Sequence, residues 1–334
     1  MKKILHLIFL LIFCYSFMIA PKYKKIEVDI NFGKLNGGGP VEFVKGIMKV
    51  LPYKNKGCLF IPSENISFIN GKNNSDYFYI SWPYFNEEVL REWKSIKRSH
   101  SLLIGPNLIP INWNAFPIKR RWYEKNWKEI LKNIKGYVVH SKRVRNHLSE
   151  RSNTEDMLNK YIIVRACTYI MPKHIKPFVD RGIDILFFEK FADSNRRKQA
   201  KELVKLFNNE GKKLLILSYG NYTKNQMLEI SNDSKFIIYF SFYDSGAIAL
   251  KEIQNFGVFA FTLQKDLAIH KKTSLYIPEL ENIDNMKPAF NIIMKKMKII
   301  SDSKPNTEIM ARINQDINKC ERALDDMCKG IYSS

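Results

Sequence analysis

The chain has 334 residues, of which 45% are hydrophobic and 13% aromatic, so it can bury one large core or two ordinary ones and is not an intrinsically disordered chain. Lys and Arg number 54 against 33 Asp and Glu, which gives a formal net charge of +21 at pH 7. Such a field attracts phosphates, nucleic acid or anionic lipid, but basic residues spread over solvated faces would give the same sum, so charge alone names no partner.

The N-terminus has the pattern of a membrane anchor. Lys2 and Lys3 precede an apolar run from Ile4 to Ala20, and lysines follow Pro21. The run is near the lower length limit for a spanning helix and longer than most signal-peptide cores, and its end fits a cleavage site poorly. The sequence therefore predicts a signal anchor over residues 1–25 and a membrane-associated, single-pass protein. The alternative is a cleaved signal peptide on a secreted or lumenal protein.

Short apolar runs alternate with amphipathic segments over the next part of the chain. The apolar runs are rich in β-branched and aromatic residues and predict strands at residues 26–32, 57–61, 77–81, 101–105 and 136–140. Helix-period patterns between them predict helices at residues 44–51, 87–97 and 122–134. Alternating strands and helices predict a parallel sheet with crossovers, so we expect an α/β domain over residues 26–172.

A second α/β unit follows a proline-containing linker at residues 173–182. It is expected over residues 183–280, with its strands and helices at residues 183–188, 194–209, 214–219, 223–231 and 236–240 and a further apolar run from Val258. Residues 281–330 are expected to be helical, because a regular stripe of apolar side chains runs from Met310 to Met327. We expect this terminal helix to pack along the body of the protein or across both domains.

A glycine-rich loop lies between the first predicted strand and the first predicted helix. It reads Asn36-Gly37-Gly38-Gly39-Pro40. Glycines there let backbone amides approach a phosphate, and a helix N-terminus favours negative charge. The loop matches neither the dinucleotide fingerprint nor the P-loop, and taken alone its glycines favour an ordinary flexible turn between strand and helix.

Two carboxylates, Asp244 and Glu252, flank the turn and helix that follow the strand at residues 236–240. If the helix begins near Ala247, Glu252 lies about a turn and a half inside it and can accept hydrogen bonds from a ribose diol. The amides of Ser245, Gly246 and Ala247 would face outward at the positive helix end. This arrangement suits a sugar nucleotide. The alternative is an exposed glutamate on an amphipathic helix with a capping Asp or Ser.

The five cysteines give no metal or disulfide pattern. They include no C-x-x-C pair, and no histidine lies at ligand spacing. The sequence therefore predicts neither a zinc site nor a disulfide framework, and the cysteines are interpreted as small buried apolar residues.

The run SFYDSGAIALKEIQNFGVFAF resembles the donor-site signature of retaining GT-B glycosyltransferases of the family 4 type, also called glycosyl transferases group 1. Further segments follow in matching order: NFGKLNGGGPVEFVKGIMKVL, GYVVHSKRVRNHL, DILFFEKFADSNRRKQAKELVKLF and LLILSYGNYTKNQM. The resemblance covers most of residues 26–275 as a pattern and is specific at residues 236–261. It implies an α/β chain with two Rossmann-like domains facing each other across a cleft, plus C-terminal helices. The first domain would be on the acceptor side, and the second would bind the nucleotide sugar.

The resemblance also implies an activity. The implied activity is that of a metal-independent, cofactor-free hexosyltransferase. Such an enzyme would move a sugar from a nucleotide-diphosphate sugar to a hydroxyl of a glycan, lipid or protein with retention of configuration. Glu252 would hold the ribose. The donor sugar and its phosphates would be held by Asp244, where the family usually has Glu, and by the amides of Ser245, Gly246 and Ala247.

Catalytic cations are implied after the first strand of the second domain. Lys190 and Arg196, with Arg197 as a substitute for the latter, would neutralise the departing diphosphate. Gly38 and Gly39 would close over the donor from the other domain. The alternative hypothesis is a basic, membrane-anchored, non-catalytic protein of the same fold that binds anionic polysaccharide, lipid or nucleic acid, with nucleic acid not favoured.

Overall fold

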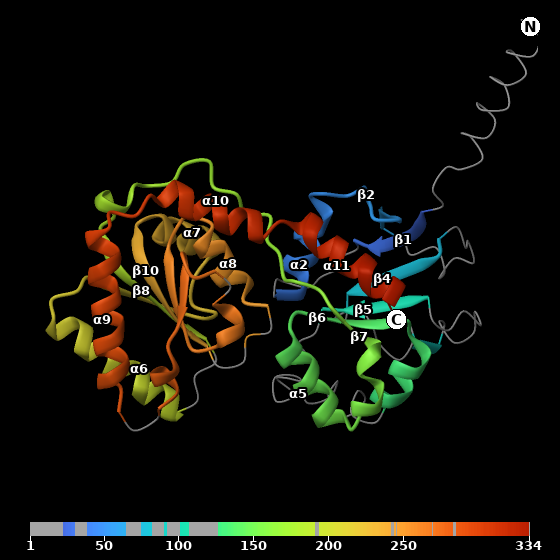
Figure 1. Ribbon diagram of the computed structural model, residues 1–334, viewed down its shortest axis with the longest axis horizontal. Coiled ribbons are helices and arrows are strands. Elements are labelled where there is room, and N and C mark those ends of the chain that lie inside the picture. Colours follow the sequence, from blue (N-terminus) through green and yellow to red (C-terminus); the bar gives the residue numbers. More distant parts are fainter. Residues whose placement is uncertain are drawn as a thin grey trace, which may run out of the picture.

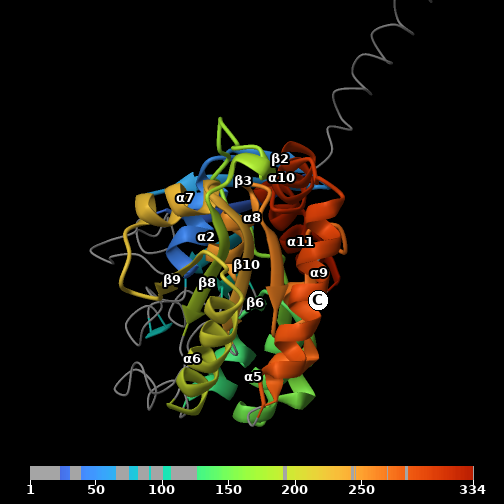
Figure 2. The same cartoon turned by 90° about the vertical axis from the view of Figure 1, so that its left-hand side faces the viewer.

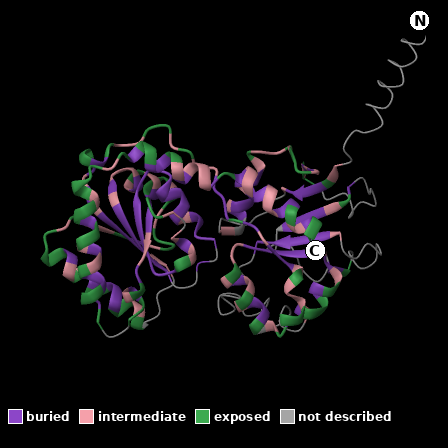
Figure 3. Cartoon of the chain, in the orientation of Figure 1, coloured by how far each residue is buried: buried purple, intermediate pink, exposed green. Residues whose placement is uncertain are grey.

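The structure is a computed structural model, and it describes residues 23–30, 39–64, 75–81, 90–91, 101–106, 126–190, 194–241, 244, 246–268, 270–282 and 285–333. These residues form two α/β bodies that lie side by side, each built on one sheet (Figure 1). Buried residues are concentrated in the strands and in the inner faces of the helices, so each body has its own core (Figure 3).

The first sheet has seven strands in the order β2-β3-β1-β4-β5-β6-β7. Their bounds are β1 Lys24–Asp29, β2 Tyr53–Asn55, β3 Cys58–Ser63, β4 Tyr77–Ser81, β5 Leu102–Gly105, β6 Gly136–Val139 and β7 Tyr161–Ile163. All neighbouring strands are parallel except β2 and β3, which pair antiparallel. The five strands expected from the sequence are present. The three-residue strands β2 and β7 were missed because they are too short to show an alternating pattern.

The helices of the first body follow the expected pattern in part. Helix α2, Gly39–Met48, begins directly at the glycine loop. Residues 126–133 are helical within the segment expected at 122–134. Helix α5, Lys142–Ser152, follows β6 and is capped by the Ser141 side chain, which accepts a hydrogen bond from the Val144 amide. The helix expected at residues 87–97 lies outside the described residues except for 90 and 91.

The second sheet has five parallel strands in the order β12-β11-β10-β8-β9. Their bounds are β8 Ile183–Lys190, β9 Leu214–Ser218, β10 Ser234–Ser241, β11 Phe259–Thr262 and β12 Ser274–Tyr276. Helices α6 (Ser194–Asn209) and α9 (Lys287–Asp302) cover one face, and α7 (Lys224–Asn232) and α8 (Ile248–Gln254) cover the other (Figure 2).

The strand order of the second sheet has one switch point, between β8 and β10. From β8 the chain goes outward to β9 and then returns to β10 on the other side of β8. In open α/β sheets, ligands bind beyond the carboxyl ends of the strands at this point. Lys190 ends β8 and is paired in register with Ser241, which ends β10. The fold therefore directs attention to the turn after β10.

The C-terminal stripe, expected to be one helix, forms two. Helix α10, Thr307–Ile317, packs on the second body, while α11, Cys320–Ser333, packs on the first (Figure 1). The break is at Asn318, whose side-chain amide donates to Asn255 Oδ1 at 2.9 Å, and whose carbonyl accepts from the Thr168 amide at 3.3 Å. The Asn318 carbonyl thus bonds Thr168 instead of an amide one turn further along a helix, and the apolar stripe is shared by two surfaces.

Two disulfides fasten α11 to the first body, and the prediction that the cysteines form none was wrong. Cys328 is bonded to Cys58 in β3, and Cys320 is bonded to Cys167 beyond β7. The partners are 270 and 153 residues apart in the sequence, so local spacing could not reveal them. All four are buried, as expected. Cys14 lies outside the described residues.

The prediction of a membrane-associated, single-pass protein is wrong for the part of the chain that the structure describes. No helix there is both long and apolar enough to cross a bilayer. The longest described helices, α6 and α9, have 16 residues each, below the roughly 20 that a spanning helix needs. Residues 1–22, on which the prediction was based, lie outside the described residues.

Candidate functional site

A buried ion pair lies at the switch point of the second sheet. Lys190 Nζ, at the end of β8, is 2.7 Å from Asp244 Oδ2, in the turn after β10. Only 11% of the lysine side chain and 6% of the aspartate side chain are exposed. The ammonium also lies over the ring of Tyr219, 4.9 Å from its centroid. The structure thus brings together two residues from separate predicted motifs.

Three further donors hold the Asp244 carboxylate. Tyr239, on β10, donates its hydroxyl to Oδ2, and the amides of Ala247 and Gly246 approach Oδ1 at 2.9 and 3.4 Å. Burial alone would raise the pKa of Asp244, but the charge and hydrogen bond of Lys190, with the other donors, outweigh it and lower the pKa to about 2. The carboxylate is therefore ionised throughout the neutral range.

The turn differs from the sequence-based expectation in one respect. The amides of Gly246 and Ala247 were expected to face outward, but both donate to Asp244 inside the turn. The reason is that the aspartate caps its own turn, much as N-cap residues satisfy the first amides of a helix. Ala247 has φ of +46°, and α8 begins after it at Ile248. Ser245 lies outside the described residues.

Glu252, the second predicted carboxylate, is 1% exposed, so the alternative of a solvent-exposed glutamate is wrong. Its carboxylate forms an ion pair with Lys224 of α7 and accepts a hydrogen bond from Thr168 Oγ1 at 3.3 Å. Burial raises the pKa of Glu252, and the charge of Lys224 offsets part of that shift. Lys224 is also 3.6 Å from Glu42 of α2, so this network joins the two bodies.

The first body meets the Asp244 turn through α5 and the end of β6. Arg143 donates hydrogen bonds to the Asp244 carbonyl at 2.9 Å and to Asp266 Oδ2 at 3.1 Å, and it also donates to the side-chain oxygen of Gln264. The ring of His140 packs on Gly246 so closely that an added Cβ would lie 2.6 Å from its Cδ2. Burial lowers the pKa of His140 to about 4, so the ring is neutral at pH 7. The turn is therefore held from both sides.

The remaining predicted residues are placed as follows. Arg196, in the first turn of α6, donates to Gln199 Oε1 at 2.8 Å and to the Glu281 carbonyl at 3.2 Å. Arg197 lines a different surface, between α6 and β9. Gly39 is the first residue of α2, and Gly38 lies outside the described residues. Tyr239, Lys224 and Arg143 were not predicted, because nothing in the sequence distinguishes them from the many other residues of their types in this chain.

Lys251 of α8 is a buried ammonium beside this site. It is 6% exposed and forms no ion pair with a described residue. Burial is the main cause that lowers its pKa to about 8. Since an unfolded lysine titrates near 10.5, the folded protein holds this proton less tightly, and at pH 7 the difference costs about 3 kcal/mol of stability.

Lys251→Met should therefore raise the free energy of unfolding at pH 7. Between pH 8 and 10.5 the Lys251 position binds more protons in the unfolded than in the native state, so the stability advantage of the variant over the wild type should shrink as the pH rises through this window. Urea denaturation at several pH values measures both. A difference in stability between variant and wild type that stays constant across this window would contradict the assignment.

Comparisons with known proteins concern the fold. No family model matches the sequence, and no curated protein matches it significantly. Among solved structures, the chain is similar to a sucrose-phosphate synthase from Thermosynechococcus elongatus, with a TM-score of 0.56, 10% identity, and 93% of this chain and 99% of that one covered. It is also similar to the apo form of the lipopolysaccharide outer core galactosyltransferase WaaB, with a TM-score of 0.53, 10% identity, and 92% and 99% covered.

At this identity the likeness concerns the fold alone. Both neighbours are covered almost from end to end, so the match includes the two bodies and not only one Rossmann-like unit. Together with the two predominantly parallel sheets, it shows that the chain has the two-domain, Rossmann-like GT-B fold that the sequence predicted.

Proposed function

We propose that the chain is a glycosyltransferase, which transfers a sugar from a nucleotide-diphosphate sugar to a hydroxyl of a glycan, lipid or protein acceptor. The observation that carries the proposal is the buried pair of Lys190 and Asp244 at the switch point of the second sheet, opposite residues of the first body. The two neighbours with the same fold are named for sugar chemistry, which supports it. In this assignment residues 26–172 contact the acceptor and residues 183–280 bind the donor.

Lys190 is proposed to neutralise the diphosphate as it leaves. Negative charge grows on the diphosphate oxygens while the glycosidic bond breaks, and a fixed, poorly solvated ammonium stabilises that charge more than water does. Arg196 is proposed as the second cation, at the start of α6. With two protein cations in this role we propose that the reaction needs no metal, so excess EDTA should leave turnover unchanged.

Glu252 is proposed to hold the nucleotide ribose, and Asp244 to accept hydrogen bonds from the donor sugar, with the amides of Gly246 and Ala247 fixing its carboxylate. Both carboxylates already have cationic partners, Lys224 and Lys190, which fix their positions. A ribose diol would share the Glu252 carboxylate with Lys224. We propose retention of configuration, which proton NMR of the first product formed would test through the coupling constant of its anomeric proton.

Glu252→Ala should abolish the stabilisation that a nucleotide diphosphate gives to the protein. A ligand that binds only the native state raises the midpoint of thermal unfolding by mass action, so a panel of nucleotide sugars and nucleotide diphosphates can be screened by thermal shift. Glu229→Ala, at an exposed position of α7, is the matched control and should respond as the wild type does. Unchanged nucleotide affinity in the Glu252 variant would refute its role.

A further inference from the structure

The second sheet ends at an open edge, which is β9. In the described part of the chain, β9 pairs only with β8. The Ile185 amide donates to the Lys213 carbonyl and the Tyr219 amide to the Glu189 carbonyl, so the backbone of the odd-numbered residues faces β8. Because strand geometry repeats every two residues, the amides and carbonyls of Leu214 and Ile216 and the amide of Ser218 face away from the sheet.

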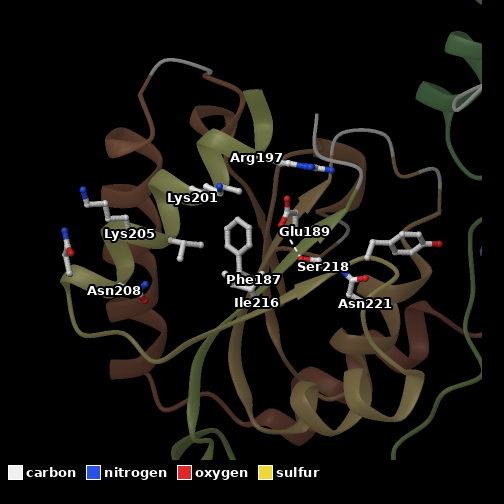
Figure 4. Close-up of a pocket in the computed structure, with 13 residues that line it drawn as sticks. Phe187, Glu189, Arg197, Lys201, Lys205, Asn208, Ile216, Ser218 and Asn221 are labelled. Carbon is white, nitrogen blue, oxygen red and sulfur yellow. Dashed lines mark hydrogen bonds between the residues drawn. The ribbon is translucent and has the colours of Figure 1, made fainter. Parts of the chain in front are cut away.

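A groove of about 1030 Å³ runs beside this edge, between β9 and the flank of α6 (Figure 4). Its lining includes the apolar side chains of Phe187, Val204 and Ile216, of which Ile216 is 47% exposed. One carboxylate, that of Glu189, also lines the groove and accepts a hydrogen bond from Ser218 Oγ at 3.4 Å. Arg197, Lys201 and Lys205 line the groove along α6 (Figure 4). Lys201 and Lys205 are exposed and form no ion pair with a described residue. Lys190, Arg196, Asp244 and Glu252 do not line the groove.

The spacing of the three cations matches an extended peptide. They are four residues apart, which places them on one side of α6 at intervals of roughly 6 Å. Alternate side chains of a β-strand point to the same face at intervals of roughly 6.6 Å. Since α6 connects two parallel strands, it runs back along them, so acidic side chains at alternate positions of a strand added to β9 would meet successive cations.

We propose that an acidic, extended peptide segment of a partner protein adds to β9 as a sixth strand. The peptide backbone forms hydrogen bonds with the outward amides and carbonyls of β9. Its acidic side chains contact Arg197, Lys201 and Lys205, and the aliphatic parts of these acidic side chains cover Ile216. Strand addition to an exposed sheet edge is a general mode of peptide recognition. The charge of the groove disfavours a second copy of the chain, which would bring its own row of cations to the same edge.

The probe is the heptapeptide acetyl-Glu-Val-Glu-Val-Glu-Val-Glu-amide with a fluorescein label, titrated with the full chain and followed by anisotropy. Lys201→Glu combined with Lys205→Glu should weaken binding by about 10-fold or more, since both opposite-charge contacts become repulsive. The matched control combines Lys198→Glu and Lys296→Glu, which change the net charge equally at exposed positions outside the groove, and should bind within a factor of about 2 of the wild type.

A second peptide separates strand addition from simple charge attraction. It is made in two versions of the same sequence, one with N-methylated valines and one with N-methylated glutamates, so that each version keeps the charge and loses one set of backbone donors. Losing two or three backbone hydrogen bonds should weaken the binding of one version by about 10-fold or more. If both versions bind as tightly as the parent peptide, the groove is a site for anionic polymers in general, such as polygalacturonate, and the proposal is overturned.

Self-association is the remaining outcome. If light scattering shows a dimer that Ile216→Lys dissociates, the edge pairs with a second copy and the partner assignment fails. None of these measurements depends on sugar transfer, so their failure leaves the proposed activity intact, and failure of that activity leaves the groove intact.

Discussion

Turnover should fall by about 100- to 1000-fold when Lys190 is replaced by alanine, the range seen when one preorganised donor to a developing charge is removed. The ammonium is nearly buried, so no water can take its place with equal effect. Binding of the intact donor should change less, because the diphosphate gains charge only as its bond to the sugar breaks. Initial rates at saturating and at low donor concentration separate kcat from KM.

The same substitution leaves Asp244 buried without its cation, which costs about 3–5 kcal/mol when one member of a buried pair is removed. Folding must therefore be tested separately, by urea denaturation. Lys190→Ala combined with Asp244→Asn removes the unpaired charge and should recover much of that stability without recovering turnover. A stable double variant with wild-type kcat would exclude Lys190 from the chemistry.

Removal of both disulfides should destabilise the first body by more than any surface change. Each link closes a long loop between α11 and the rest of the chain, and loss of a native disulfide costs about 2–5 kcal/mol. The test is Cys320→Ser with Cys328→Ser, compared with the wild type in urea. Gly46 lies against the Cys320–Cys167 pair, and an added Cβ would be 2.8 Å from Cys320 Sγ, so the helix α2 is fitted to this link.

Reducing agent provides the control. The wild type in dithiothreitol should approach the stability of the double variant, whereas the double variant should not respond to it. Mass spectrometry of peptides from the unreduced protein should find Cys58 linked to Cys328 and Cys167 linked to Cys320. Alkylation of all four thiols without reduction would show that the links do not form.

The strands and the turn after β10 could be predicted because their signals are local. The run from Phe236 to Phe240 is apolar and β-rich, and Asp244 and Glu252 follow at a fixed spacing. The structure places Asp244 and Glu252 at the carboxyl edge of the sheet, as the pattern indicated, and it buries both. Their roles in binding and catalysis stay predictions.

The partners of those residues could not be predicted, because they come from distant parts of the chain. Arg143 is 101 residues from Asp244, and Thr168 is 84 residues from Glu252. Nothing in an arginine or threonine at such a distance distinguishes it from the other residues of its type in the sequence. The same holds for the cysteine pairs, and for β9, whose position at the edge of the sheet depends on the order of all five strands.

The return of α11 to the first body limits how the two bodies can move. The chain passes between them twice, once beyond β7 and once at Asn318, and the two passages are joined by the hydrogen bond from the Thr168 amide to the Asn318 carbonyl. Two joined connections restrict twisting and sliding of the bodies more than a single linker would, so they form the natural hinge between them. Thr168 also donates its hydroxyl to Glu252, so any ligand that takes over this carboxylate changes a bond beside that hinge.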